Sequence, residues 1–107
     1  MPGATEPMDE TEIDEYADAV LSAVEAVPVG RVSSYGAIAA QVGRALGRGG
    51  PRQVARVMRA YGAAVPWYRI ARADGTLAPE VASRQAELLA TEGVPVRNGR
   101  VPRSFRL

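Results

Sequence analysis

The sequence predicts one α+β domain that is mostly helical, with a helix-turn-helix and a winged-helix-like arrangement. Three observations lead to this fold class. Four stretches repeat apolar residues at helical spacing, two of these stretches are short and joined by a glycine-rich turn, and Asn98-Gly99 between short flanks is a hairpin signal. A chain of 107 residues can form one modest core. We assign residues 11–107 to the domain and expect residues 1–10, rich in proline and acids, to be a disordered lead-in.

The first helix is predicted from Thr11, its N-cap, to Val27. Its apolar residues keep helical spacing over four turns: Ile13, Tyr16, Ala17, Val20, Leu21, Val24 and Val27. The outer face is acidic and would repel phosphates, so we expect this helix to be scaffold.

A second, shorter helix is predicted over Tyr35 to Val42, after an extended piece at residues 31–34. Ser33 or Ser34 can cap it, and its inward residues are Ile38, Ala39 and Val42. The eight residues from Gly43 to Gly50 hold four glycines and two arginines, and they predict a flexible cationic turn.

The third helix, predicted over Pro51 to Tyr61, has two different faces. Its apolar face is a stripe of residues at i, i+3, i+4 and i+7: Val54, Val57, Met58 and Tyr61. The opposite face carries Arg52, Ala55, Arg56 and Arg59. A solvated charged surface is the plain interpretation of this arginine face, and a nucleic-acid contact is the alternative.

The rest of the chain predicts a short strand, a helix and a hairpin. Val65 to Ile70 is the strand, and Asp74-Gly75 is the turn after it. The last helix is expected over Val81 to Thr91, with Leu88 and Leu89 buried and Gly93 as its stop.

Charge is segregated along the chain, although the net charge is only +1. Residues 1–29 hold eight acids and no base, whereas residues 30–107 hold thirteen arginines and four acids, a balance of +9. A coding bias can explain why every base is arginine, but it does not explain the segregation of sign. A basic module of this size favours a polyanion partner, nucleic acid above all.

The composition excludes several kinds of chemistry. The absence of cysteine and histidine removes thiolate nucleophiles, imidazole bases and the usual zinc ligands, so we expect no metal and no cofactor. No apolar run reaches the roughly 20 residues of a membrane span, and the first residues do not have the pattern of a signal peptide. A cytoplasmic protein is expected.

Several motifs, in order, resemble the DNA-binding domain of O6-alkylguanine-DNA alkyltransferases. They are Gly30-Arg-Val-Ser-Ser-Tyr35-Gly, the helix with Arg52, Val65-Pro-Trp-Tyr-Arg69, Asp74-Gly75 and Glu87-Leu-Leu-Ala-Thr-Glu92-Gly93. The resemblance runs from about Tyr16 to Val96. The active enzymes carry the alkyl-accepting cysteine in a Pro-Cys-His-Arg motif, and this chain has Pro66-Trp67-Tyr68-Arg69. Tryptophan in place of that cysteine is the mark of the alkyltransferase-like proteins, which bind alkylated guanine without repairing it.

The resemblance implies roles for individual residues. Tyr35 matches the tyrosine that helps to rotate a nucleotide out of the stack, and Arg52 matches the arginine that fills the vacated space. The family inserts this helix into the minor groove, and the small Ala55 suits a close approach. The DNA-contacting residues implied are Ser34, Tyr35, Arg52, Gln53, Ala55, Arg56 and Arg59, and the lesion pocket implied is made of Tyr35, Pro66, Trp67, Tyr68 and Arg69.

Some residues depart from the family pattern or admit a simpler interpretation. Trp67 and Tyr35 could be ordinary core residues. Tyr68 stands where the family has histidine, and Glu92, which supports cysteine activation in the enzymes, is interpreted here as structural. Residues 74–81 form a shorter lesion-facing loop, which lacks the arginine that alkyltransferase-like proteins can use there.

The resulting hypothesis is a non-enzymatic, monomeric sensor of O6-alkylguanine in double-stranded DNA that flags the lesion for nucleotide excision repair proteins. It would be nucleoid-associated when bound to DNA. One rival is a sequence-specific winged-helix regulator that uses Arg52, Arg56 and Arg59 in the major groove. A second rival is an enzyme that uses Asp74 or Glu92 as acid or base, although a lone carboxylate is a poor catalytic set.

Overall fold

The computed structural model describes residues 10–107, with side chains from Glu15 onward. The predicted lead-in lies outside the described residues, except Glu10, which belongs to the first helix. The helices and strands in chain order are α1 (Glu10–Glu25), β1 (Ser33–Ser34), α2 (Tyr35–Leu46), α3 (Pro51–Tyr61), β2 (Ile70–Ala71) and α4 (Ala82–Thr91). Short 3-10 helices cover Gly62–Ala64, Trp67–Arg69 and Arg103–Phe105.

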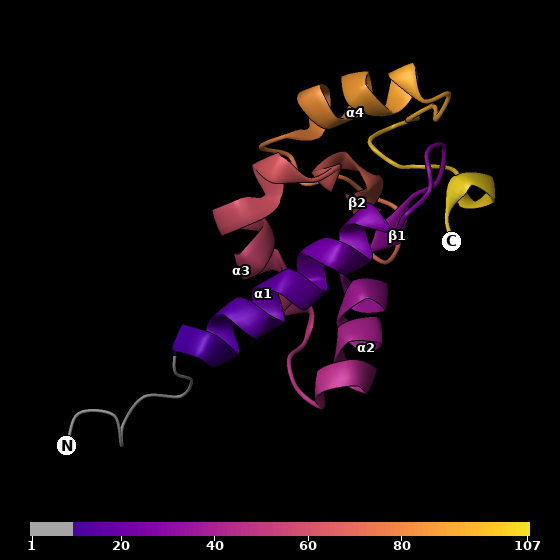
Figure 1. The fold of residues 1–107 in the computed structure, drawn as a ribbon. Helices are drawn as coiled ribbons and strands as arrows, with labels where there is room; N and C mark the ends of the chain where they lie inside the picture. The colour runs from indigo at the N-terminus through magenta and orange to yellow at the C-terminus, as the bar shows by residue number, and fades with distance from the viewer. Residues whose placement is uncertain (1–9) are drawn as a thin grey trace.

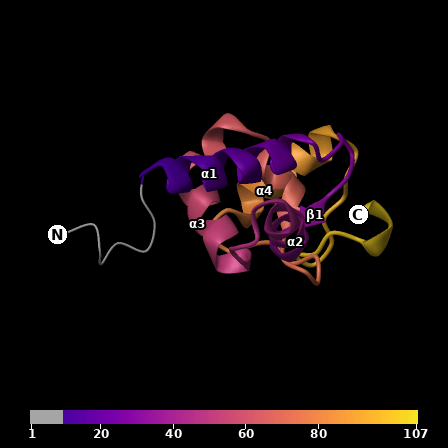
Figure 2. The same cartoon turned by 60° about the horizontal axis from the view of Figure 1, so that its bottom comes forward.

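Three helices form the larger part of the domain. In Figures 1 and 2, α1 lies along the pair formed by α2 and α3. Figure 1 shows α4 apart from these three helices, on the other side of the strands. The shared core takes Tyr16, Val20, Val24 and Val27 from the apolar stripe predicted for the first helix, and also Ala23, which the prediction left out. The three residues predicted on α2 are buried in it, together with Val54 of α3 and Ile70. Leu21 is only half-buried, and the side chain of Ile13 lies outside the described residues. The mostly helical α+β class with a helix-turn-helix is confirmed.

The two strands separate this core from a second, smaller one. β1 and β2 pair in parallel, with Ser33 opposite Ile70 and Ser34 opposite Ala71. Successive residues of a strand point to opposite faces, and accordingly Ile70 packs into the helical core and Ala71 into the second core. The second core also holds Val32, Leu77, Leu89, Val94 and Val101.

The N-cap of the second helix is one that the sequence predicts, whereas its C-cap is not. Ser34 is the N-cap of α2, and its Oγ accepts a hydrogen bond of 3.0 Å from the Ala37 N–H. α2 continues one turn beyond the predicted Val42, because Gly43 stays helical and Gly47 takes the left-handed conformation that ends the helix. The predicted turn from Gly43 to Gly50 is therefore shorter.

Gly49 lets this turn pack directly on α1. It has φ of +92°, and a Cβ at this position would collide with the ring and hydroxyl of Tyr16. Arg48 lies 5.9 Å from the centre of the same ring, a cation–π distance. The connection that links α2 to α3 is thus held against the scaffold helix.

Two predicted strand features differ from the structure. The strand expected over Val65 to Ile70 is wrong for most of its length, because residues 67–69 wind into a 3-10 helix and only Ile70 joins β2. The hairpin at Asn98-Gly99 is present, with φ of 55° and 72°, but it is limited to the pairing of Arg97 with Arg100. The hairpin that would form the wing of a winged-helix domain is therefore only one residue pair long.

The last helix, α4, begins at Ala82, one residue later than predicted. Leu89 is fully buried as expected, whereas Leu88 is only half-buried. Gln85 is buried, and its Nε2 donates to the carbonyls of Tyr68 at 3.0 Å and Ile70 at 2.8 Å. These bonds tie α4 to the segment that carries Trp67. Within residues 10–107, every helix is too short or too polar to cross a membrane.

Candidate nucleic-acid interface

The arginine face of α3 is present as the sequence predicts. Arg52, Arg56 and Arg59 are exposed, and none of them forms an ion pair with another described residue. Val54 on the opposite face is fully buried. Three unpaired guanidinium groups on one exposed helix face suit contact with the phosphates of a nucleic acid.

The side chains on the apolar face of α3 become less buried toward the C-terminal end of the helix. Val57 and Met58 are half-buried, and Tyr61, expected in the core, is 49% exposed. That expectation for Tyr61 is wrong because α3 ends at this residue, at the edge of the helical core.

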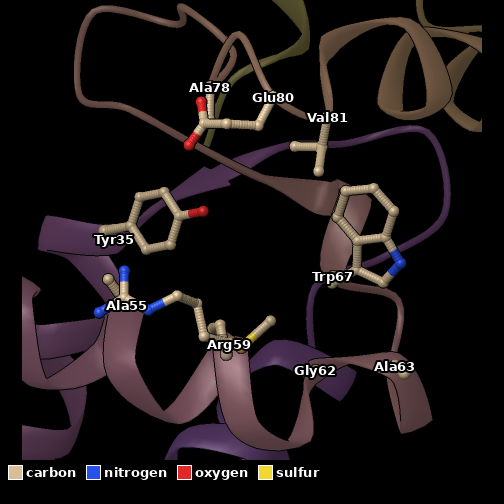
Figure 3. A pocket seen from close by; sticks show the side chains of 10 residues that line it. Tyr35, Ala55, Arg59, Gly62, Ala63, Trp67, Ala78, Glu80 and Val81 are labelled. Atoms are coloured by element: carbon tan, nitrogen blue, oxygen red, sulfur yellow. The ribbon is translucent and has the colours of Figure 1, made fainter.

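A cavity of about 360 Å³ opens beside this helix. Figure 3 shows the phenol of Tyr35 and the indole of Trp67 on opposite sides of it, with Glu80 and Val81 above. Arg59 of α3 lies below, with its guanidinium under the Tyr35 ring beside Ala55. The lining residues are Tyr35, Ala55, Met58, Arg59, Gly62, Ala63, Trp67, Ala78, Glu80 and Val81. Its size is within the range of about 300–1,000 Å³ that is typical of ligand pockets.

Tyr35 brings a hydroxyl group to this cavity. Burial raises the pKa of the Tyr35 phenol, Arg72 and Arg59 lower it, and Glu80 raises it. The net effect is a raised pKa, so the hydroxyl keeps its proton at neutral pH. A protonated phenol can donate a hydrogen bond to a phosphate or a base.

Three residues of the predicted lesion pocket do not line the cavity: Pro66, Tyr68 and Arg69. The Tyr68 hydroxyl donates a 2.9 Å hydrogen bond to Glu92 Oε2. Arg69 Nη2 donates to the same oxygen at 2.7 Å, and Arg69 Nη1 donates to the Val27 carbonyl at 2.9 Å. The 3-10 helix turns successive side chains in different directions, so only Trp67 of the four-residue motif reaches the cavity.

Glu92 is occupied by structural bonds. Besides Tyr68 and Arg69, it accepts a 3.2 Å hydrogen bond from the Gly30 N–H. The Arg69 guanidinium holds the pKa of the Glu92 carboxyl below its ordinary value, and the bonds from Gly30 and Tyr68 add to this effect against the opposing effect of burial. The structural interpretation of Glu92 therefore fits, and the carboxylate is not available as a base.

Ser34 and Gln53, also predicted to contact DNA, serve as caps. Ser34 caps α2, and Gln53 Oε1 accepts a 3.0 Å hydrogen bond from the Gly50 N–H at the start of α3. Each side chain keeps a donor group for a further partner: the Ser34 hydroxyl and the Gln53 amide.

Sequence reasoning missed several parts of the lining. Met58 was assigned to the core because of its spacing, and Gly62 and Ala63 carry no pattern that signals a cavity. Glu80 and Val81 belong to the loop that the family resemblance marks as lesion-facing, but nothing in the sequence placed them opposite Arg59. Among the described residues, no cluster of potential metal ligands accompanies the cavity.

Comparison with known proteins gives the family. The model of the 6-O-methylguanine DNA methyltransferase DNA-binding domain matches residues 15–94. Alkyltransferase-like protein 1 of Schizosaccharomyces pombe is 36% identical over 90 residues, which cover 78% of this chain and 81% of that protein.

Solved structures of the fission-yeast protein have the same fold. Atl1 in complex with damaged DNA containing O6-carboxymethylguanine superimposes with a TM-score of 0.73 at 30% identity. A second complex of the S. pombe protein with DNA gives a TM-score of 0.69 at 29% identity. Each match covers 88% of this chain and 95% of the other. The chain therefore belongs to the 6-O-methylguanine DNA methyltransferase family as an alkyltransferase-like protein.

Proposed function

We propose that this protein is a non-enzymatic sensor that binds O6-alkylguanine in duplex DNA and holds the flipped base in the cavity between Tyr35 and Trp67. The observation that carries the proposal is the position of this cavity, directly beside the unpaired arginines of α3. The S. pombe relative binds damaged DNA through the same fold, which supports the same class of ligand here.

The geometry of α3 supports entry into the minor groove. Ala55 lies on the arginine face and also lines the cavity, so at this position between the arginines a small side chain lets the helix backbone approach the groove floor. Arg52 lies one turn earlier on this face and would fill the space that the rotated nucleotide leaves, with its guanidinium stacked on the neighbouring bases.

The energetics of base rotation would supply part of the selectivity. Extruding a paired base costs a few kcal/mol, and the cost is smaller for a base whose pairing edge is damaged. O6-alkylguanine is such a base. Trp67 then offers an aromatic wall on which the extruded purine can stack, worth about 1–3 kcal/mol per base.

The chemistry of the cavity supports binding without repair. The sequence contains no cysteine, and the indole of Trp67 cannot accept an alkyl group as a thiolate does. The complex would therefore persist with the alkyl group in place, and we propose that the monomer flags it for nucleotide excision repair in the cytoplasmic nucleoid.

Fluorescence of Trp67 gives a direct test, because it is the one tryptophan of the chain. Matched duplexes with and without one O6-methylguanine are titrated at fixed, near-physiological salt. We expect stronger quenching and tighter binding with the alkylated duplex, and mass spectrometry should find the alkyl group still on the DNA.

Arg52→Ala should weaken both effects by about tenfold, whereas Arg97→Ala, which removes an exposed arginine of the hairpin, should change them little. Equal binding of both duplexes by the unmodified chain would reject the sensor function. A preferred DNA sequence would instead favour the regulator.

A further inference from the structure

A second cavity, of about 170 Å³, is lined by Ser34, the residue that precedes Tyr35. Its lining combines β1, the residues that follow β2 and the C-terminal segment: Val32, Ser33, Ser34, Arg72, Ala73, Arg103, Arg106 and Leu107. Three of these side chains are arginines, and none is acidic. Neither the family match nor the proposed lesion pocket accounts for this cluster of charge.

The strand register places Arg72 beside Tyr35. Ser34 is opposite Ala71 in the parallel pair, so the next residues of the two segments, Tyr35 and Arg72, leave the sheet at the same edge. The positive charge of Arg72 lowers the pKa of the Tyr35 phenol, which is consistent with this proximity. Arg72, which lines the second cavity, therefore lies near Tyr35, which lines the first.

The tail brings the other two arginines to the same place by backbone pairing. Val32 donates to the Phe105 carbonyl at 2.9 Å, and Leu107 donates to the Val32 carbonyl at 2.9 Å. Figure 1 shows the end of the chain next to β1. Arg106 is further fixed by a 3.4 Å bond from Nη1 to the Ala73 carbonyl. The tail thus runs parallel to β1 and holds its arginines at the cavity.

These arginines have no counter-ion within the described part of the chain. Arg72, Arg103 and Arg106 form no ion pair with a described residue, so no carboxylate side chain offsets the repulsion between their guanidinium groups. An anion would relieve this repulsion. Planar guanidinium groups bind phosphate oxygens with paired hydrogen bonds, and the Ser33 and Ser34 hydroxyls at the start of α2 add donors at the positive end of a helix.

We propose that this cavity binds a backbone phosphate of the DNA strand next to the rotated nucleotide, held by Arg72, Arg103 and Arg106. The proposal rests on the proposed function, because it takes the lesion cavity as the place where the nucleotide enters. The C-terminal residues 103–107 would then hold the DNA strand at a point separate from the arginine face of α3. We call this phosphate site, made by Arg72, Arg103 and Arg106, the clamp.

A phosphate-neutralisation series tests the clamp. In a set of duplexes, one phosphate at a time around the lesion is replaced by an uncharged methylphosphonate, and binding of the full chain is measured by fluorescence anisotropy. We expect one position where neutralisation weakens binding of the unmodified chain about tenfold but weakens the double variant Arg103→Gln/Arg106→Gln less than twofold. The slope of log K against log salt should also fall by about 0.9 for each phosphate that the variant no longer neutralises.

Control variants distinguish a specific phosphate site from the general effect of removing positive charge. Arg97→Gln removes one exposed arginine that lines neither cavity, and it should show the same dependence on phosphate position as the unmodified chain. Arg103→Gln alone serves if the double variant does not fold, because the Arg103 side chain is exposed. Equal losses at every position for the unmodified chain and the variants would overturn the proposal.

Two further arms identify the source of the phosphate and separate the two proposals. Inorganic phosphate is titrated against the unmodified chain, and millimolar binding with a flat neutralisation series would overturn the assignment to DNA. The series is repeated on duplexes without the lesion. If binding shows no preference for the lesion but still depends on the phosphate position, the sensor function is rejected and the phosphate site is kept. If binding prefers the lesion but does not depend on the phosphate position, only the phosphate site is rejected.

Discussion

Arg69 and Glu92 form an ion pair with 2.7 Å between Nη2 and Oε2, and their side chains are only 12% and 9% exposed. The pair joins the segment that carries Trp67 to the end of α4. The family resemblance implies that Glu92 stands where the active alkyltransferases have a glutamate that supports the reactive cysteine. Here the same position holds the wall of the cavity in place.

Glu92→Gln should destabilise the fold by about 2 kcal/mol, because it removes charge-assisted hydrogen bonds at a nearly buried site. Urea unfolding followed by Trp67 fluorescence measures the change. Glu87→Gln is the matched control, since it removes the partner of Arg84 in an exposed pair with 3.4 Å between Nη1 and Oε1, for which we expect less than about 0.5 kcal/mol. Similar losses for the two variants would contradict a structural role of Glu92.

The same group predicts how stability depends on pH. The folded-state pKa of Glu92 is depressed, first of all by Arg69, so the unfolded state binds more protons at this group near its ordinary pKa. Its contribution is complete above the unfolded pKa of about 4.3 and is lost as the pH falls through the lower folded value. Urea unfolding between pH 6 and pH 3 should give a shallower decline for Glu92→Gln than for the unmodified chain, and parallel declines would refute this prediction.

Gly49→Ala should be much more destabilising than Gly47→Ala. Both glycines have positive φ, but a Cβ at Gly49 meets the Tyr16 ring, whereas a Cβ at Gly47 meets nothing within 4 Å. We expect about 1 kcal/mol for Gly47→Ala from backbone strain alone and about 2–4 kcal/mol for Gly49→Ala from strain and overpacking together. Thermal unfolding by circular dichroism checks the order, and equal shifts in Tm would show that the turn can move off α1.

The charges around the cavity predict a preference among adducts. Glu80 and Arg59 both line it, so Glu80→Gln should raise the affinity for O6-carboxymethylguanine relative to O6-methylguanine, and Arg59→Gln should lower the same ratio. We expect about threefold to tenfold in each direction, typical of partly exposed charges. Competition anisotropy with the two duplexes measures the ratio, and a ratio unmoved by either variant would show that the adduct lies away from both side chains.

Local patterns were enough to predict most of the fold. Helical spacing identified Ile38, Ala39 and Val42 as the core face of α2, and Ser34 was one of the two residues expected to cap it. The strand predicted over Val65 to Ile70 failed because apolar residues in a short run do not distinguish an extended segment from a 3-10 helix. The register of the two-residue sheet carries no local signal at all.

Only those residues of the candidate site that belong to a family motif could be predicted from the sequence. The resemblance brought Tyr35 and Trp67 together, and both line the cavity. The resemblance also implied that Tyr68 lines the lesion pocket, but no motif shows that the Tyr68 side chain turns toward Glu92 instead. The second cavity joins Arg72 to Arg106, 34 positions apart in the printed sequence, and only the pairing of the tail with Val32 reveals it.

The parallel pairing of β1 with β2 has a consequence for the order of folding. Ser33 and Ile70 are neighbours in the sheet, yet α2 and α3 lie between them in the chain, so the loop must close before Tyr35 and Trp67 can face each other. Contacts between such distant segments form slowly because of their loop-closure entropy. A chain still being synthesised would therefore display its arginine helix before it has a cavity, and recognition of a damaged base would be the last property that the domain acquires.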